Sequence, residues 1–136
     1  MWSAVELDRN GLEVLSREDC LRLLATAVLG RVAVSSRALP TIVPVTFHYD
    51  GRHILIRTGR GTRLDAATRD AVVAFEADEV SNSWNAGWSV VVTGVARELT
   101  DPDEIAAAQH PSLARWGSAS DDRLVAISPD VVSGRR

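Results

Sequence analysis

The chain has 136 residues, 46% of them apolar, a net charge of −3 and one cysteine. It contains no apolar run near the ~20 residues that span a bilayer, and an acidic chain lacks the broad basic face that binds nucleic acid. We therefore expect one soluble cytoplasmic domain over residues 1–136, with no membrane or nucleic-acid partner, no signal peptide, and Cys20 packed in the core.

The first half of the chain predicts one helix followed by strands. Residues 16–28 have a helical pattern that begins with Ser16 as N-cap and is stopped by Gly30. Residues 31–36 predict a strand, and residues 39–58 predict two strands joined by Asp50-Gly51, with positive φ at both turn positions.

Pro44 lies inside the first of these two strands. Proline cannot donate a ladder hydrogen bond, so we expect Pro44 at a bulge or on a sheet edge.

The second half of the chain alternates helices and strands. The predicted elements are a short helix at 62–70, a buried strand at 71–78, a polar loop at 79–87, a strand at 87–99, a helix at 101–109 and one short strand within 123–134. Gly94 interrupts the long strand where a sheet could bend. Six or so mostly antiparallel strands with helices between them predict a small β-barrel with α additions.

The stretch RTGRGTRLDA, residues 57–66, places positive charge directly after an apolar strand. Gly59 and Gly61 allow consecutive amides to form an anion-binding nest, and Thr62 before Asp65 predicts a capped helix beside it. Every basic residue of the chain is arginine, so a phosphate would meet guanidinium groups and backbone amides. The residues alone favour a phosphate site and a solvated turn about equally.

Four blocks in this order resemble the pyridoxamine 5′-phosphate oxidase-like family of flavin-binding split barrels, particularly its short actinobacterial members. The blocks are LSREDCLRLLATAVLGRVAV, PTIVPVTFHYDGRHILIRTGRGTRLDAATRDAVVAFEADE, GWSVVVTGVARELTD and ISPDVVSGRR. The resemblance implies a mainly β fold with α additions, a six-stranded antiparallel split β-barrel. It also implies a homodimer with FMN in a groove between the subunits.

The resemblance assigns a cofactor site but no catalytic residue and no metal. The residues implied at the FMN phosphate are Arg57, Thr58, Arg60, Gly61, Thr62 and Arg63. Those implied beside the isoalloxazine are Pro44, Val45 and Thr46, with Trp88 and Ser89 approaching from the other side.

The implied function is that of an FMN-dependent oxidoreductase acting on a small molecule. The segment PTIVPVT lacks the arginine and lysine of members that oxidise pyridoxamine phosphate, so we do not expect vitamin B6 oxidation. Two alternatives stay open: a deazaflavin-dependent reductase, and a non-catalytic protein that binds or stores flavin or haem. His48 and His53 are interpreted as ordinary strand residues without metal-ligand spacing, and Trp84 and Trp116 as interface or core residues.

Overall fold

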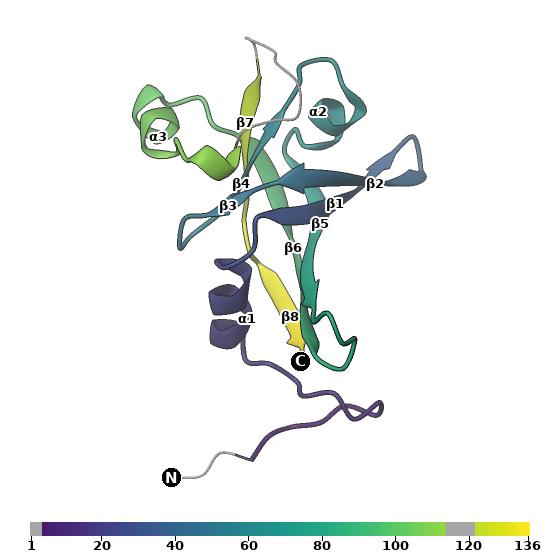
Figure 1. Cartoon of the computed structure of the whole chain (residues 1–136). Coiled ribbons are helices and arrows are strands. Elements are labelled where there is room, and N and C mark those ends of the chain that lie inside the picture. The colour runs from purple at the N-terminus through teal and green to yellow at the C-terminus, as the bar shows by residue number, and fades with distance from the viewer. Residues whose placement is uncertain (1–3, 114–121) are drawn as a thin grey trace.

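A computed structural model of the chain describes residues 4–113 and 122–136 and shows a curled antiparallel sheet flanked by short helices (Figure 1). The elements in chain order are α1 Arg17–Leu24, β1 Leu29–Ser36, β2 Leu39–Thr46, β3 His48–Tyr49, β4 Ile54–Thr58, α2 Arg63–Ala67, β5 Ala71–Val80, β6 Gly87–Glu98, α3 Pro102–Ala107, the 3₁₀ helix η1 Pro111–Leu113, β7 Arg123–Ile127 and β8 Val131–Arg135. Within these two ranges, no helix has the length and apolar composition to cross a lipid bilayer.

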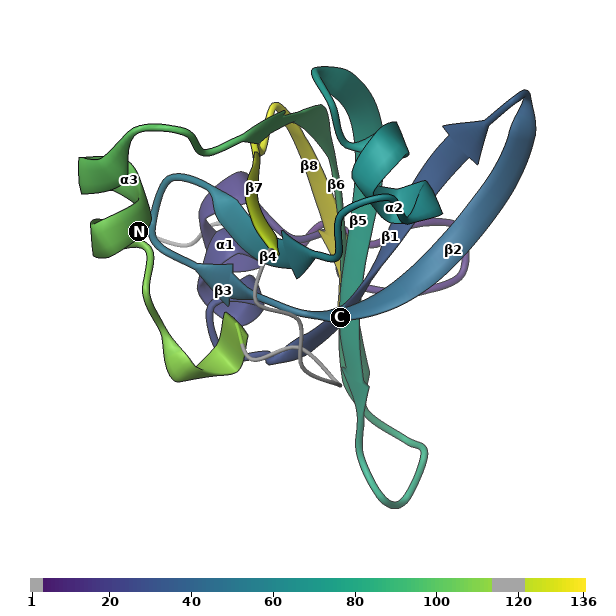
Figure 2. The ribbon, with the colours of Figure 1, turned by 90° about the horizontal axis from the view of Figure 1, so that it is seen from above.

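The sheet forms a half-barrel, which confirms the predicted split-barrel fold (Figure 2). Its strands follow the order β2-β1-β5-β6-β7-β4-β3, and β8 pairs with β6 beside β7. The described residues form eight strands where six were expected. The additional strands arise because Phe47 separates β2 from β3, and residues 128–130 separate β7 from β8.

The main core lies inside the curl of the sheet. Phe47 and Phe75 meet edge to face at its centre with ring centroids 4.7 Å apart. A second apolar cluster lies on the other face of β4 and β7, where Leu55 and Leu124 pack with α3 and η1. Strands β4 and β7 therefore bury both faces, and every residue of β7 is buried.

Gly94 marks the point where β6 changes its partner. Residues 89–93 pair with β8 and residues 96–98 pair with β7, while β5 pairs with β6 along its length. A Cβ at Gly94 would overlap the backbone oxygen of Ser128 in the connection between β7 and β8. Position 94 therefore requires a glycine, because the backbone of Ser128 approaches it closely.

Pro44 lies on an edge strand, as predicted. β2 pairs only with β1 in the sheet, with Pro44 opposite Arg31. Because the strand lies at the edge, the missing N–H of Pro44 removes no hydrogen bond from the interior of the sheet.

The first helix is shorter than predicted. Ser16 caps α1 by accepting a hydrogen bond from the amide of Asp19, but the helix ends at Leu24 because the backbone of Val28 already pairs with Phe47. Gly30 does not stop the helix. It lies within β1, where a Cβ would overlap the ring of Phe75.

Two turns also differ from the prediction. The loop between β3 and β4 spans four residues, and only Gly51 has positive φ, because Asp50 instead accepts hydrogen bonds from the amides of Arg52 and His53. A true two-residue turn joins β1 to β2. It consists of Arg37 and Ala38, both with positive φ. The sequence does not indicate this conformation, because neither residue is a glycine.

Candidate functional site

A cavity of about 220 Å³ opens where the ends of β2 and β4 approach each other. These two strands are far apart in the sheet order, and the curl of the sheet brings them into contact. The residues that line the cavity are Val43, Pro44, Val45, Thr46, Arg57, Thr58, Gly59, Thr62, Leu64 and Leu113. Six positions assigned from the sequence meet here: Pro44, Val45, Thr46, Arg57, Thr58 and Thr62.

Thr58 is the residue of the cavity whose polar atom lacks a partner. Its side chain is 1% exposed, and its Oγ1 makes no hydrogen bond within the described part of the chain. A buried hydroxyl without a partner costs about 1–3 kcal/mol. Arg57 also lines the cavity, and its guanidinium donates to Oε1 of Gln109 at 2.9 Å. The cavity therefore offers a cation and a hydroxyl donor that an acceptor group could satisfy.

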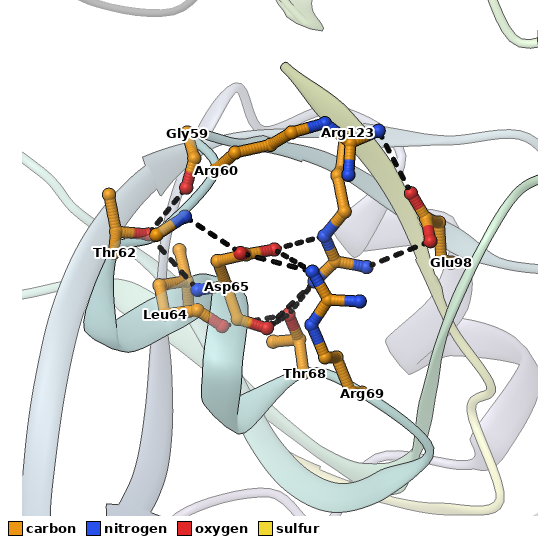
Figure 3. Close-up of polar contacts among 10 residues, drawn as sticks. Gly59, Arg60, Thr62, Leu64, Asp65, Thr68, Arg69, Glu98 and Arg123 are labelled. Carbon is orange, nitrogen blue, oxygen red and sulfur yellow. Dashed lines mark hydrogen bonds and ion pairs between the residues drawn. The ribbon is translucent and has the colours of Figure 1, made fainter. Parts of the chain in front are cut away.

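The turn from Gly59 to Thr62 forms one wall of the cavity, and its donors are used internally (Figure 3). The amide of Gly61 donates to Oδ2 of Asp65 at 2.9 Å. The hydroxyl of Thr62 donates to the carbonyl of Gly59 at 2.7 Å and accepts from the amide of Asp65 at 3.0 Å, which confirms the predicted helix cap. The chain's own carboxylate thus occupies the predicted amide nest at Gly61.

Asp65 belongs to a buried polar network that sequence reasoning missed. Its side chain accepts from Nε of Arg123 and from Nη2 of Arg69, and Arg123 also donates to the Asp65 carbonyl at 2.7 Å and to Oγ1 of Thr68 at 3.1 Å. Burial opposes ionisation of Asp65, but the hydrogen bonds from Gly61, Arg123 and Arg69 outweigh it and hold its pKa below the ordinary 3.8. Asp65 is therefore charged near neutral pH.

The other two arginines of the stretch do not line the cavity. Arg60 forms an ion pair with Glu98 at 3.4 Å, and Nη1 of Arg63 lies 3.5 Å from Oγ1 of Thr41. Both side chains are exposed, so each could turn towards a ligand at little cost.

Trp88 and Ser89 lie elsewhere in the protomer, at the start of β6. They line a second cavity of about 520 Å³ together with Trp84 and Arg135. Ser89 lies on the outer face of the sheet, which is the face turned away from the main core. It pairs with Asp78, and Asp78 shares this face with Glu76 because the two residues lie two positions apart on β5. Pro44 shares that face through the cross-strand row Pro44, Arg31, Glu76 and Val91.

Of the remaining candidate residues, Trp84 lines the second cavity, His48 and Cys20 line neither cavity, and Trp116 lies outside the described residues. His48 stacks on His110 with ring centroids 3.8 Å apart, and burial together with His110 lowers the pKa of His48. Cys20 is fully buried, as predicted, and burial raises the pKa of its thiol. Trp84 is 85% exposed and so is no core residue, while Trp116 lies outside the described residues. The described ranges hold no group of three His, Cys, Asp or Glu side chains placed to bind a metal.

Comparison with known proteins gives concordant matches over most of the chain. The family model for pyridoxamine 5′-phosphate oxidase matches residues 16–136. The chain is 40% identical over 131 residues to an uncharacterised protein of Mycobacterium tuberculosis, covering 90% of this chain and 83% of that protein. The structure is similar to that of the FAD binding protein from Mycobacterium smegmatis, with a TM-score of 0.78, 35% identity, and coverage of 90% and 95% of the two chains. It is also similar to a protein of Corynebacterium glutamicum, with a TM-score of 0.79, 35% identity, and 91% of each chain covered.

Proposed function

The chain belongs to the pyridoxamine 5′-phosphate oxidase family, and we propose that it is an FMN-dependent oxidoreductase that holds the FMN phosphate in the cavity between β2 and β4. The observation that carries the proposal is the buried hydroxyl of Thr58, which has no hydrogen-bond partner among the described residues and belongs to a cavity that Arg57 also lines. The FAD binding protein of Mycobacterium smegmatis supports a flavin as the ligand.

Thr58 and Arg57 would bind the phosphate directly in this proposal. Hydrogen bonds to a charged group are the stronger ones, about 1.5–3 kcal/mol each. Arg63 and Arg60 would turn in from the rim, while Gly61 and Thr62 shape the turn against which the phosphate lies. FMN, when bound, would supply the hydride chemistry, which explains why the cavity contains no acid-base pair of its own.

The isoalloxazine would lie along the outer edge of the sheet. Pro44, Val45 and Thr46 line the cavity and belong to the edge strand, whose outward side has no neighbouring strand within the protomer. Trp88 and Ser89 would reach the ring from a second copy of the chain, since they lie far from the cavity within one protomer.

The outer face of β2, β1, β5 and β6 fits contact with that second copy. Cross-strand neighbours on this face include exposed Ile42, Val72, Val91 and Val95. Exposed apolar side chains on one face of a sheet, here next to the ion pair between Arg31 and Glu76, are typical of an interface. We therefore propose a homodimer in which the face that carries Pro44 and Ser89 is shared.

We predict that the protein is a dimer at micromolar concentration. Ile42→Asp places a charge in the proposed interface and should shift the protein to monomers, as measured by multi-angle light scattering. Val5→Asp makes the same change at an equally exposed position in the N-terminal segment and should leave the dimer intact. A wild-type protein that is monomeric at this concentration would rule out the shared groove.

We also predict opposite responses of stability and FMN affinity to Thr58→Val. Valine has nearly the same shape and removes an unpaired buried hydroxyl, so the free energy of unfolding should stay equal or rise. FMN affinity should fall by about tenfold, as expected for one hydrogen bond to a charged group. Calorimetric titrations with FMN and with riboflavin, which lacks the phosphate, measure this change. Riboflavin affinity should not change.

Arg63→Ala extends the same titrations to the rim of the cavity. It should weaken FMN binding by about tenfold to a hundredfold without affecting riboflavin. Arg52→Ala is the matched control, because Arg52 is a nearby arginine that precedes this stretch and lies in the exposed loop between β3 and β4. If FMN binding responds to Arg52 and ignores both Thr58 and Arg63, the phosphate does not bind here.

The absorption spectrum of the purified protein separates this proposal from the alternatives. A flavin, a deazaflavin and a haem each absorb at distinct wavelengths. Bleaching of a bound flavin by a nicotinamide donor under anaerobic conditions supports an oxidoreductase. A coloured protein that no donor bleaches supports a binding or storage role.

A further inference from the structure

Asp65 and Arg123 are the buried charged side chains of the described residues, and neither lines the cavity. Figure 3 shows the two side chains in contact, with Asp65 next to the turn that carries Gly59 and Thr62 and Arg123 beyond it. Burying a charge is costly even when it is paired. A role at the wall of a ligand cavity would explain why this site contains such a pair.

The carboxylate of Asp65 holds the turn at Gly61. Gly61 has φ +78°, and no atom lies within 4 Å of the position that a Cβ would take there. Packing therefore does not fix this residue. Its conformation depends on the hydrogen bond from its amide to Asp65, supported by the bond from Thr62 to Gly59.

The charges around Asp65 favour an anion in the cavity. Arg60, Arg69 and Arg123 face the carboxylates of Asp65 and Glu98, so the cluster behind the turn carries one net positive charge. The Asp65 carboxylate can thus hold an amide of the turn without repelling a phosphate on the other side.

We infer that Asp65 is a positioning residue for the anionic group of the ligand: it fixes the turn from Gly59 to Thr62, which forms the wall of the cavity next to Thr58. Arg123 balances its charge and holds its carbonyl in place. The inference rests on the proposed binding of the FMN phosphate in the cavity. Asp65 acts on the ligand only through the turn.

Asp65→Asn tests this role. Asparagine has the same shape, but one of its two terminal atoms is an NH₂ donor. The Gly61 amide and the Arg123 guanidinium donate to different oxygens of Asp65, so asparagine in the same position cannot accept from both. FMN affinity should fall by about tenfold, while riboflavin affinity stays at the wild-type value. Asp70→Asn is the control. It removes the same charge from an exposed position in the same segment, and asparagine tolerates the positive φ found there.

A double variant, Asp65→Leu with Arg123→Met, provides an independent check. It replaces a buried ion pair with apolar side chains, an exchange that often preserves stability. It should reproduce the selective loss of FMN affinity. An equal loss for FMN and riboflavin, or no loss for FMN, overturns the positioning role. A wild-type protein that binds FMN no better than riboflavin refutes the proposed phosphate site itself.

Discussion

Replacing Arg123 with alanine is expected to lower the free energy of unfolding by about 3–5 kcal/mol. The Arg123 side chain is fully buried and donates to the Asp65 carboxylate, to the Asp65 carbonyl and to Thr68. Without it, the buried carboxylate retains the Gly61 amide and one cation, Arg69, whose side chain is half exposed. Urea denaturation followed by circular dichroism measures the change.

Arg97→Ala is the matched control for Arg123→Ala. Arg97 pairs with Glu104 at 3.1 Å, with both side chains more than 40% exposed, so its loss should cost less than about 1 kcal/mol. The two variants should also differ in acid. The pKa of Asp65 is lowered in the folded state, so its stabilisation is present above the ordinary value of 3.8 and is lost as pH falls through the lower folded value. The cost of Arg123→Ala should therefore shrink at strongly acidic pH, and equal costs for both variants at neutral pH would contradict the buried pair.

Gly94→Ala is expected to destabilise the protein by about 3 kcal/mol or more. The added methyl group would overlap the Ser128 carbonyl, which belongs to the backbone and cannot move aside by a rotamer change. The overlap falls where β6 passes from β8 to β7, so relief would require separating two strand pairs. Thermal unfolding measured by calorimetry gives the loss.

Gly51→Ala is the control that separates the effect of steric overlap from the effect of replacing a glycine. Gly51 has φ +93° with open space around it, so alanine there costs only backbone strain, about 1 kcal/mol. A Gly94→Ala variant no less stable than Gly51→Ala would show that the junction of β6, β7 and β8 is looser than the structure indicates.

Local sequence signals predicted the helix N-caps correctly. Ser16, Thr62 and Asp101 each cap the helix that the sequence assigned to them, because a cap depends only on residues two or three positions away. The predicted strands end at residue 36 and begin at residue 39, so the position of the turn of Arg37 and Ala38 was predicted. Its positive φ values were not, because the pairing of β1 with β2 imposes them on residues that do not favour them. Gly30 was misread for the same reason: it is required by Phe75, 45 positions later in the sequence.

The candidate site likewise combines features that local sequence signals predicted with features that depend on residues far apart in the sequence. The stretch around Gly59 predicted a turn and a capped helix, and both are present. No local pattern indicated that the Asp65 side chain would accept the hydrogen bond of the Gly61 amide, since the partner of Asp65, Arg123, lies 58 residues away and follows no periodic pattern. The unpaired hydroxyl of Thr58 likewise becomes visible only when burial is known.

The affinity of the wild-type protein for FMN compared with riboflavin tests the central claim most directly. The two ligands share the ring and the ribityl chain and differ only in the phosphate. If the cavity between β2 and β4 holds that phosphate, calorimetry should find FMN bound at least about tenfold more tightly, with the advantage reduced by added inorganic phosphate. Equal affinity for the two ligands, or an advantage that inorganic phosphate leaves unchanged, would contradict a phosphate site at Arg57 and Thr58.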